Sequence, residues 1–317
     1  MISRRLLRIK TLKLLFSNAA ADEIAMPRID KELQLSIQKT YELYHFLLSS
    51  ASAVADYAEE RIAIGLNKHR PTPEEALPNR KFVENKLITM LRRNCSLLQY
   101  CGKYHLSWNG DHVTFIRDIY NRMIQQDYYK TYMASEEHSF DADREFLKEF
   151  FLNEFEDNQS LEAMLEEKSV WWGADDVGYA ISSIIRTLDV ITPAQRDTKQ
   201  LAPTQPMPED EEFAKRLLRH SLIHYSDYWN CAMQFVQNWE NDRVAAMDTM
   251  LIVQGFAEAI EFPEIPIRIT INEHVELAKY YSTNSSHVFV NAVLDRMIKQ
   301  GTDEGLVVKA NLGLVEK

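Results

Sequence analysis

The stretch TINEHVELAKYYSTNSSHVFVNAVLD, Thr270 to Asp295, decides the fold of this chain of 317 residues. Thr270 and Glu273 have the T-x-x-E spacing of a capping box, which predicts a helix from Ile271 to Lys279. A turn rich in Ser, Thr and Asn follows, and a second helix with an inward apolar face begins after it. The preceding residues 267–271, IRITI, alternate in a way that predicts a short extended piece.

The rest of the chain is dominated by helical spacing of apolar residues. Apolar residues from Ile2 to Phe16 recur three and four apart, which predicts a helix over 3–17 with one buried stripe. The sequence has only nine glycines and ten prolines and shows no βαβ rhythm. We therefore predict an all-α fold. Further helical patterns lie at 30–62, 82–100, 112–132, 141–167, up to Val190 after the WWGADD turn, 213–236 and 244–262.

Charge is unevenly distributed along the sequence. The net charge is −11, but the first 21 residues hold five Arg and Lys and no acid. A basic arm on an acidic body indicates one small anion-binding patch, and the body could receive a basic protein. The same arm has a rival interpretation as a mitochondrial transit peptide. Three cysteines without metal-type spacing, and no apolar run long enough to span a membrane, favour a cytoplasmic protein.

The motifs of several enzyme classes are absent from the sequence. It contains neither a P-loop nor a G-x-G-x-x-G loop, which argues against nucleotide-dependent chemistry. His220 and His224 have the H-x-x-x-H spacing, but Ser221 stands where a metalloprotease has its glutamate. We therefore expect no catalytic residues, no metal and no cofactor.

Two distant segments resemble one family. TINEHVELAK and then SHVFVNAVLD, Ser286 to Asp295, resemble the C-terminal signature of the NusB family. RRLLRIKTLKLLFS, Arg4 to Ser17, resembles the opening of that family, and WENDR, Trp239 to Arg243, resembles its middle. Ala292 replaces the usual glycine of the last helix, which puts detailed contacts in doubt but not the fold.

The resemblance implies an organisation for the chain. It implies a NusB-like fold of two packed helical bundles, with 1–18 as its first helix and 209–300 as its remainder. Residues 19–208 then look like the long helical insertion of Bacteroidetes-type NusB proteins. The insertion ends in a linker, since Thr192 to Pro208 holds four prolines and no periodicity. Residues 301–317 would be a C-terminal tail.

The resemblance also implies a function. NusB-like proteins are non-enzymatic factors of processive transcription antitermination that act with other Nus factors in the elongation complex on ribosomal RNA operons. They pair with the ribosomal protein NusE and bind single-stranded boxA RNA. Two alternatives stay open: a protein-binding adaptor without RNA binding, and an RNA-binding module linked to ribosomal RNA modification.

The expected roles of individual residues follow from the resemblance and the charge pattern. Arginines of the first helix would contact RNA phosphates, and aromatic side chains would stack an unpaired base or else pack in the core. Residues at the start of the last helix would hold a phosphate, and an acid of the 244–262 helix would contact NusE. The arginines are Arg4, Arg5 and Arg8, and the aromatic residues are Phe16 and Phe289. The residues at the start of the last helix are Ser285, Ser286 and His287, and the acid is Glu258.

Overall fold

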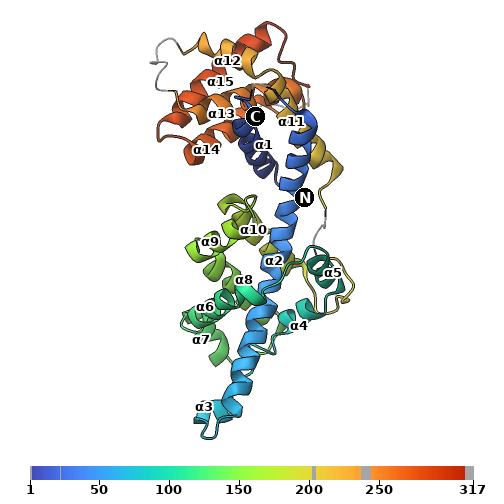
Figure 1. Ribbon diagram of the computed structural model, residues 1–317, viewed down its shortest axis with the longest axis vertical. Helices are drawn as coiled ribbons and strands as arrows, with labels where there is room; N and C mark the ends of the chain where they lie inside the picture. The colour runs from blue at the N-terminus through green and yellow to red at the C-terminus, as the bar shows by residue number, and fades with distance from the viewer. Residues whose placement is uncertain (1, 22, 202–204, 237–243, 311–317) are drawn as a thin grey trace. The chain divides into compact units, whose positions relative to one another are not determined.

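The computed structural model describes residues 2–21, 23–201, 205–236 and 244–310, and every regular element within these ranges is a helix (Figure 1). This confirms the all-α prediction. The chain divides into two compact units: unit 1, residues 1–37 with 206–317, and unit 2, residues 38–205. Among the described helices, none is both long and apolar enough to cross a membrane.

Unit 1 is built around one central helix, α13 (Ala246–Glu261), which contacts five other helices. Leu251, Ile252 and Val253 are consecutive and each is fully buried, so α13 is enclosed on all sides. The other elements of unit 1 are α1 (Arg4–Asn18), the first turns of α2 (Met26–Leu66), α11 (Pro208–Ile223), α12 (Tyr225–Met233), α14 (Ile267–Tyr281) and α15 (Ser286–Asp303).

A glycine sets how closely α14 and α15 approach the central helix. A Cβ added to Gly255 would lie 2.9 Å from Cδ1 of Leu294 and 3.2 Å from Cγ of His274. Only glycine leaves room for both side chains at this crossing. The absence of a side chain at Gly255 therefore lets His274 of α14 pack directly against α13.

Two predictions about the opening stretch are wrong. Residues 267–271 are helical, because α14 already begins at Ile267, directly after Pro266. Thr270 is an interior residue of α14 and not its cap, and its hydroxyl donates to Glu258. The alternation over five residues was too short to distinguish a strand from a helix. The T-x-x-E pair instead makes tertiary contacts, and α15 continues past Gly301 to Asp303.

Unit 2 has an aromatic core around α2. Phe46 is fully buried, and the centres of the Trp108 and Trp172 rings lie 4.0 Å and 5.8 Å from its own. Nε1 of Trp172 donates to the carbonyl of Lys39, so the WWG turn is anchored in this core. The remaining elements are α3 (Pro73–Ala76), α4 (Lys86–Arg93), α5 (Cys95–Lys103), η1 (Gly110–His112), α6 (Val113–Met123), α7 (Asp127–Ala134), α8 (Phe140–Phe155), α9 (Gln159–Lys168) and α10 (Ala174–Val190).

Several long helical patterns are interrupted, one of them by a side-chain cap. The pattern over 82–100 contains two helices, because the side chain of Asn94 accepts from the amide of Leu97 and starts α5. The patterns over 112–132 and 213–236 likewise contain two helices each. The helical pattern at 30–62 starts later than the helix itself, since Asp30 lies inside α2, where its carboxylate pairs with Arg219. The WENDR turn lies outside the described residues.

Candidate nucleic-acid interface

The three predicted arginines of α1 lie in different environments. Ser3 caps the helix by accepting from the amide of Leu6, so the arginines occupy its first two turns. Arg4 is exposed, and its guanidinium carbon lies 4.9 Å from the ring centre of Phe213 in α11. The Arg5 side chain is 51% exposed, whereas that of Arg8 is only 3% exposed. The three side chains therefore differ strongly in burial, although they lie within five residues of one helix.

Arg8 is the centre of a buried ion pair. Its Nε lies 2.6 Å from Oε2 of Glu258, and its Nη2 lies 2.9 Å from Oε1. Glu258, in α13, has no exposed surface. The hydroxyl of Thr270 donates to the same carboxylate at 2.8 Å. A bidentate pair of this kind joins α1, α13 and α14 through charge-assisted hydrogen bonds.

The environment of Glu258 keeps its carboxylate ionised. Burial by itself would raise the pKa of Glu258. The Arg8 guanidinium and the Thr270 hydroxyl, which both hydrogen-bond the carboxylate, hold this pKa below its usual value. Arg8 and Glu258 are therefore both charged, and each neutralises the other within the interior of unit 1.

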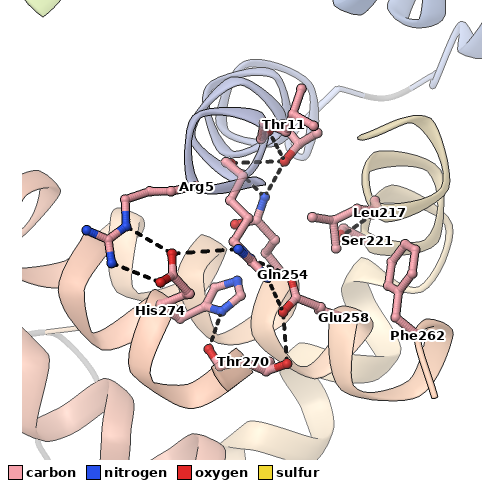
Figure 2. A network of polar contacts seen from close by, with 12 residues as sticks. Arg5, Thr11, Leu217, Ser221, Gln254, Glu258, Phe262, Thr270 and His274 are labelled. Atoms are coloured by element: carbon pink, nitrogen blue, oxygen red, sulfur yellow. Dashed lines mark hydrogen bonds and ion pairs between the residues drawn. The ribbon is translucent and has the colours of Figure 1, made fainter. Parts of the chain in front are cut away.

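Two further polar side chains complete this buried set (Figure 2). His274 is fully buried, and its Nδ1 donates to the carbonyl of Thr270 at 2.8 Å. Burial lowers the pKa of His274, which favours the neutral ring. Gln254 of α13 donates through Nε2 to the carbonyl of Arg8 and to the hydroxyl of Thr11. These contacts fix the backbone of α1, and not only its side chains, to α13.

Side chains of α1 and α14 meet along an exposed seam. Arg5 makes a bidentate pair with Glu273 at 2.9 Å and 2.8 Å, as Figure 2 shows from close by. Two turns further along both helices, Nζ of Lys13 lies 5.7 Å from the ring centre of Tyr281. The two contacts are eight residues apart on each helix, or about 12 Å at the rise of an α-helix. The seam therefore presents Arg5 near one end and Lys13 with Tyr281 near the other.

A depression of about 310 Å³ lies at the Arg5 end of the seam. The three arginines of α1, Glu273 and residues from the 264–269 segment form its walls. Glu273 is shared, because Nη1 of Arg8 lies 3.6 Å from its Oε2 while Arg5 holds both of its oxygens. The Arg5 hydrogen bond lowers the pKa of Glu273 and outweighs its partial burial. An incoming phosphate would compete with Glu273 for Arg5.

The remaining predicted residues divide into exposed and buried positions. Phe16 is 47% exposed and lies three residues after Lys13, so the two side chains are neighbours on α1. Phe289 is 4% exposed and belongs to the core. Ser285 is exposed at the start of α15 and makes no side-chain cap, and His287 is half-buried. Ser286 is 2% exposed, and its hydroxyl donates to Asp248 at 2.8 Å.

The structure reassigns four of the predicted residues to the interior. Arg8 and Glu258 satisfy one another, and Glu258 has no surface through which it could touch a partner. Ser286 and Phe289 are buried within unit 1. Sequence reasoning overlooked Lys13 and Tyr281 as site residues. The three-residue spacing of Lys13 and Phe16 was a signal that could have indicated them.

Comparison with known proteins identifies the family. The NusB family profile matches residues 190–299, which include α11 to α14 and most of α15. The transcription antitermination protein NusB of Salinibacter ruber is 33% identical over 108 residues, which are 34% of this chain and 68% of that protein. The chain belongs to the NusB family.

Other NusB proteins show similar levels of identity. Those of Chloroherpeton thalassium and Symbiobacterium thermophilum are 30% and 32% identical over 106 and 110 residues. These alignments cover 33% of this chain in each case, and 50% and 72% of the two relatives. The chain thus spans only part of the NusB proteins that it matches. No solved structure matches it.

The NusB profile match begins after α1, yet α1 belongs to the same unit. Arg8 lies outside the matched range and Glu258 lies inside it, and their buried pair ties the two segments together. The seam between α1 and α14 likewise combines residues from outside and inside the matched range.

His220, the first histidine of the H-x-x-x-H pattern, lies in α11 and makes contacts within the protein. Nδ1 of His220 lies 2.9 Å from Glu261, and its Nε2 contacts the hydroxyl of Tyr228. Both ring nitrogens of His220 are therefore engaged within the protein. In the described part of the chain, no group of three or more His, Cys, Asp or Glu residues is placed to hold a metal ion.

Proposed function

We propose that this chain is a cytoplasmic, non-enzymatic transcription antitermination factor. It binds boxA-type single-stranded RNA together with the ribosomal protein NusE and promotes processive transcription of ribosomal RNA operons. Membership of the NusB family supports this function, since the aligned relatives are named transcription antitermination proteins. The observation that carries the RNA part of the proposal is the exposed seam between α1 and α14.

The seam has the two properties that single-stranded RNA requires. Cations attract the phosphate backbone, and exposed aromatic rings offer stacking platforms for unpaired bases. Arg4 and Arg5 supply cations at one end, while Lys13 and Phe16 combine a cation and a half-exposed ring at the other. The start of α15 at Ser285 follows α14 by a short turn and adds backbone N–H groups.

Arg8 has a different role in this proposal. Because it is buried and paired with Glu258, it holds α1 against α13 and leaves phosphate contacts to the exposed Arg4 and Arg5. Exchange of Glu273 for a phosphate at Arg5 would keep that guanidinium paired in both states. RNA binding at this end therefore does not leave the Arg5 guanidinium buried without a partner, so its energetic cost is small.

NusE would bind to the acidic surface of unit 1 away from Glu258. The NusE protein with which NusB-like proteins pair is a basic ribosomal protein, and charge complementarity favours an acidic surface for such a partner. Glu264 is exposed in the wall of the depression, and Glu261 of α13 is partly exposed and pairs with Arg216. These two carboxylates replace Glu258 as candidates for the NusE contact.

Fluorescence anisotropy of a labelled boxA-like RNA, with and without NusE across a salt series, tests the proposal. The double variant Arg4→Ala/Arg5→Ala should weaken binding and reduce the slope of log affinity against log salt by about 1.4, since each phosphate contact contributes about 0.7 on a single strand. Arg296→Ala is the matched control. Arg296 is an exposed arginine of α15, about 15 Å along that helix from Ser286.

The outcomes separate the candidate functions. Binding that tightens with NusE, prefers boxA over a scrambled RNA and loses slope only in the α1 variant would support the proposal. Equal slope changes in the Arg296 control would remove the seam from the RNA site. A folded protein that binds NusE but no RNA in either condition would favour the protein-binding adaptor.

A further inference from the structure

A groove in unit 2 runs beside α2 and plays no part in the proposed RNA site. Its volume is about 380 Å³. One wall is a single face of α2, on which Ser49, Ser52, Asp56 and Glu60 follow at spacings of three and four residues. Eleven residues of helix separate the first from the last, which corresponds to about 16 Å. The groove is therefore long enough for about three turns of a second helix.

The opposite wall is apolar and reaches the surface. Buried residues from the 106–109 segment and α6, including Leu106, Trp108 and Ile116, form the inner part of the groove. At its rim, Leu98 of α5 is 55% exposed and Val113 of α6 is 46% exposed. A small molecule inside the groove would leave both rim side chains in water. An occupant that covers them must be larger, which favours a polypeptide segment.

The polar groups on the α2 side select for positive charge. Asp56 and Glu60 both carry exposed carboxylates, and Arg92 is the one guanidinium among the lining residues, where it pairs with Asp56. Burial raises the pKa of the Cys101 thiol to about 11, so this lining residue stays uncharged. The lining therefore carries two negative charges and one positive charge. The repulsion of phosphates by these carboxylates disfavours nucleic acid as the occupant.

Two polar groups among the lining residues have an unused hydrogen-bonding capacity. The Ser52 hydroxyl oxygen is buried and makes no hydrogen bond to any described residue, and the same holds for Nε of Arg92. Ser49, one turn earlier, already accepts from Nε1 of Trp108 and donates to the carbonyl of Phe46. Buried polar groups without partners are uncommon in folded proteins. Both atoms lie beneath the lining of the groove, so they mark a buried polar patch there that the described residues leave without a hydrogen bond.

We propose that this groove binds an amphipathic helical segment of a partner protein that carries Lys or Arg beside its apolar stripe. Apolar side chains one turn apart contact Leu98, Val113 and the floor at Trp108. The basic side chain lies over Asp56 and Glu60, with its aliphatic stem on the apolar wall. This arrangement is the helix-in-groove mode of recognition. It assigns unit 2 a protein-docking role that is independent of RNA binding by unit 1.

Selection from a random library of 16-residue peptides displayed on phage provides the test. The full-length protein is the target, and Leu98→Asp is the counter-target, because a charge at this half-exposed position blocks the rim without filling the core. We expect enriched peptides with apolar residues three and four apart and a net positive charge. No enrichment over the Leu98→Asp protein, or enrichment of acidic peptides, would overturn the proposal.

The affinity of one enriched peptide, measured by anisotropy, gives the quantitative test. Asp56→Asn/Glu60→Gln should weaken binding by roughly tenfold through the lost charge pairs, and Leu98→Asp should weaken it by more than fivefold. The matched controls are Asp118→Asn/Glu145→Gln and Leu77→Asp, which change exposed residues of unit 2 outside the groove. Equal losses in the controls would overturn the assignment of the site.

Two readouts distinguish this inference from its competitors. RNA binding should be the same for wild type and Leu98→Asp, since the groove and the seam belong to different units. The protein should also sediment at the same rate with and without the Leu98→Asp change. Self-association that Leu98→Asp abolishes, together with no peptide enriched over the Leu98→Asp protein, would show that a second copy of the chain occupies the groove, which contradicts the proposal.

Discussion

Replacing Arg8 by Met should destabilise unit 1 strongly while leaving unit 2 unchanged. The guanidinium of Arg8 makes two hydrogen bonds, at 2.6 Å and 2.9 Å, to a Glu258 carboxylate that has no exposure. Removal of one partner of a buried ion pair typically costs about 3–5 kcal/mol, because the other charge remains in the interior. Thr270 still donates to Glu258 in the variant. We therefore expect a loss of about 3 kcal/mol, at the lower end of that range.

A double variant separates the cost of the orphaned carboxylate from the loss of packing. In Arg8→Met/Glu258→Met both charges are absent and apolar side chains of similar length replace them. Such replacements of a whole buried pair are often neutral or stabilising. The double variant should therefore recover most of the stability that Arg8→Met loses. A double variant less stable than either single variant would show that the pair itself is strongly favourable.

Native-state hydrogen exchange is the appropriate assay because it reports the local stability of each helix, and so of each unit, separately. Peptides from α13 and α14 should exchange roughly 100-fold faster in Arg8→Met, since each 1.4 kcal/mol corresponds to a factor of ten. Peptides from α8 and α10 of unit 2 serve as the internal control. Unchanged exchange in α13 and α14, combined with a lower salt slope of RNA binding, would refute the structural role and return Arg8 to the RNA site.

Three further predictions test other features of the structure. Acidification from pH 7.5 to 5.5 should destabilise unit 1, because burial lowers the pKa of His274 in the folded state below its usual value of 6.5. Below that pH the unfolded chain takes up a proton at His274 that the folded chain does not. Each pH unit below about 6.5 then lowers the free energy of unfolding by up to about 1.4 kcal/mol. Thermal unfolding should show a smaller loss for His274→Gln, although His220 shifts in the same direction in both proteins, and equal losses would contradict the assignment. Gly255→Ala should destabilise the protein by about 1–3 kcal/mol through its contact with Leu294, whereas Gly178→Ala, which meets no atom within 4 Å in α10, should stabilise it by up to about 1 kcal/mol in urea titrations. Asn94→Ala should cost about 1 kcal/mol of unit 2 stability by removing the cap of α5, and unchanged exchange of the α5 amides would exclude that role.

The fold class could be predicted from the sequence because helical periodicity records burial directly. The helix predicted over 3–17 and the helix ended by Val190 lie where the pattern placed them, as α1 and α10. The single buried stripe expected for α1 is wrong, since Phe16 at its end is 47% exposed while Arg8 and Lys10 are buried. Helix boundaries were less accessible. Asn94 interrupts a continuous apolar pattern by capping α5, and nothing in the spacing of the neighbouring leucines indicates this break. The cap is a local hydrogen bond, and periodicity over several turns does not record it.

The division of the chain was only partly accessible from the sequence. The proline-rich segment before residue 206 marks one boundary between the compact units. The other falls between residues 37 and 38, inside α2, where the apolar stripe continues without a break. A helix shared by two units carries no loop residues to mark where one core ends. The expected start of the insertion at residue 19 concerns the family alignment and stays a prediction.

The candidate site shows why charge in a sequence does not by itself locate a binding surface. Arg4, Arg5 and Arg8 have the same side-chain chemistry, and their spacing places them near one another. Their burial depends on partners about 250 residues away along the chain. Arg8 pairs with the buried Glu258, and Arg5 pairs with Glu273 at the surface. These two acids belong to α13 and α14, which pack closely through Gly255. The sequence identifies the cations, but only the packing of the central helix decides which of them can meet a phosphate.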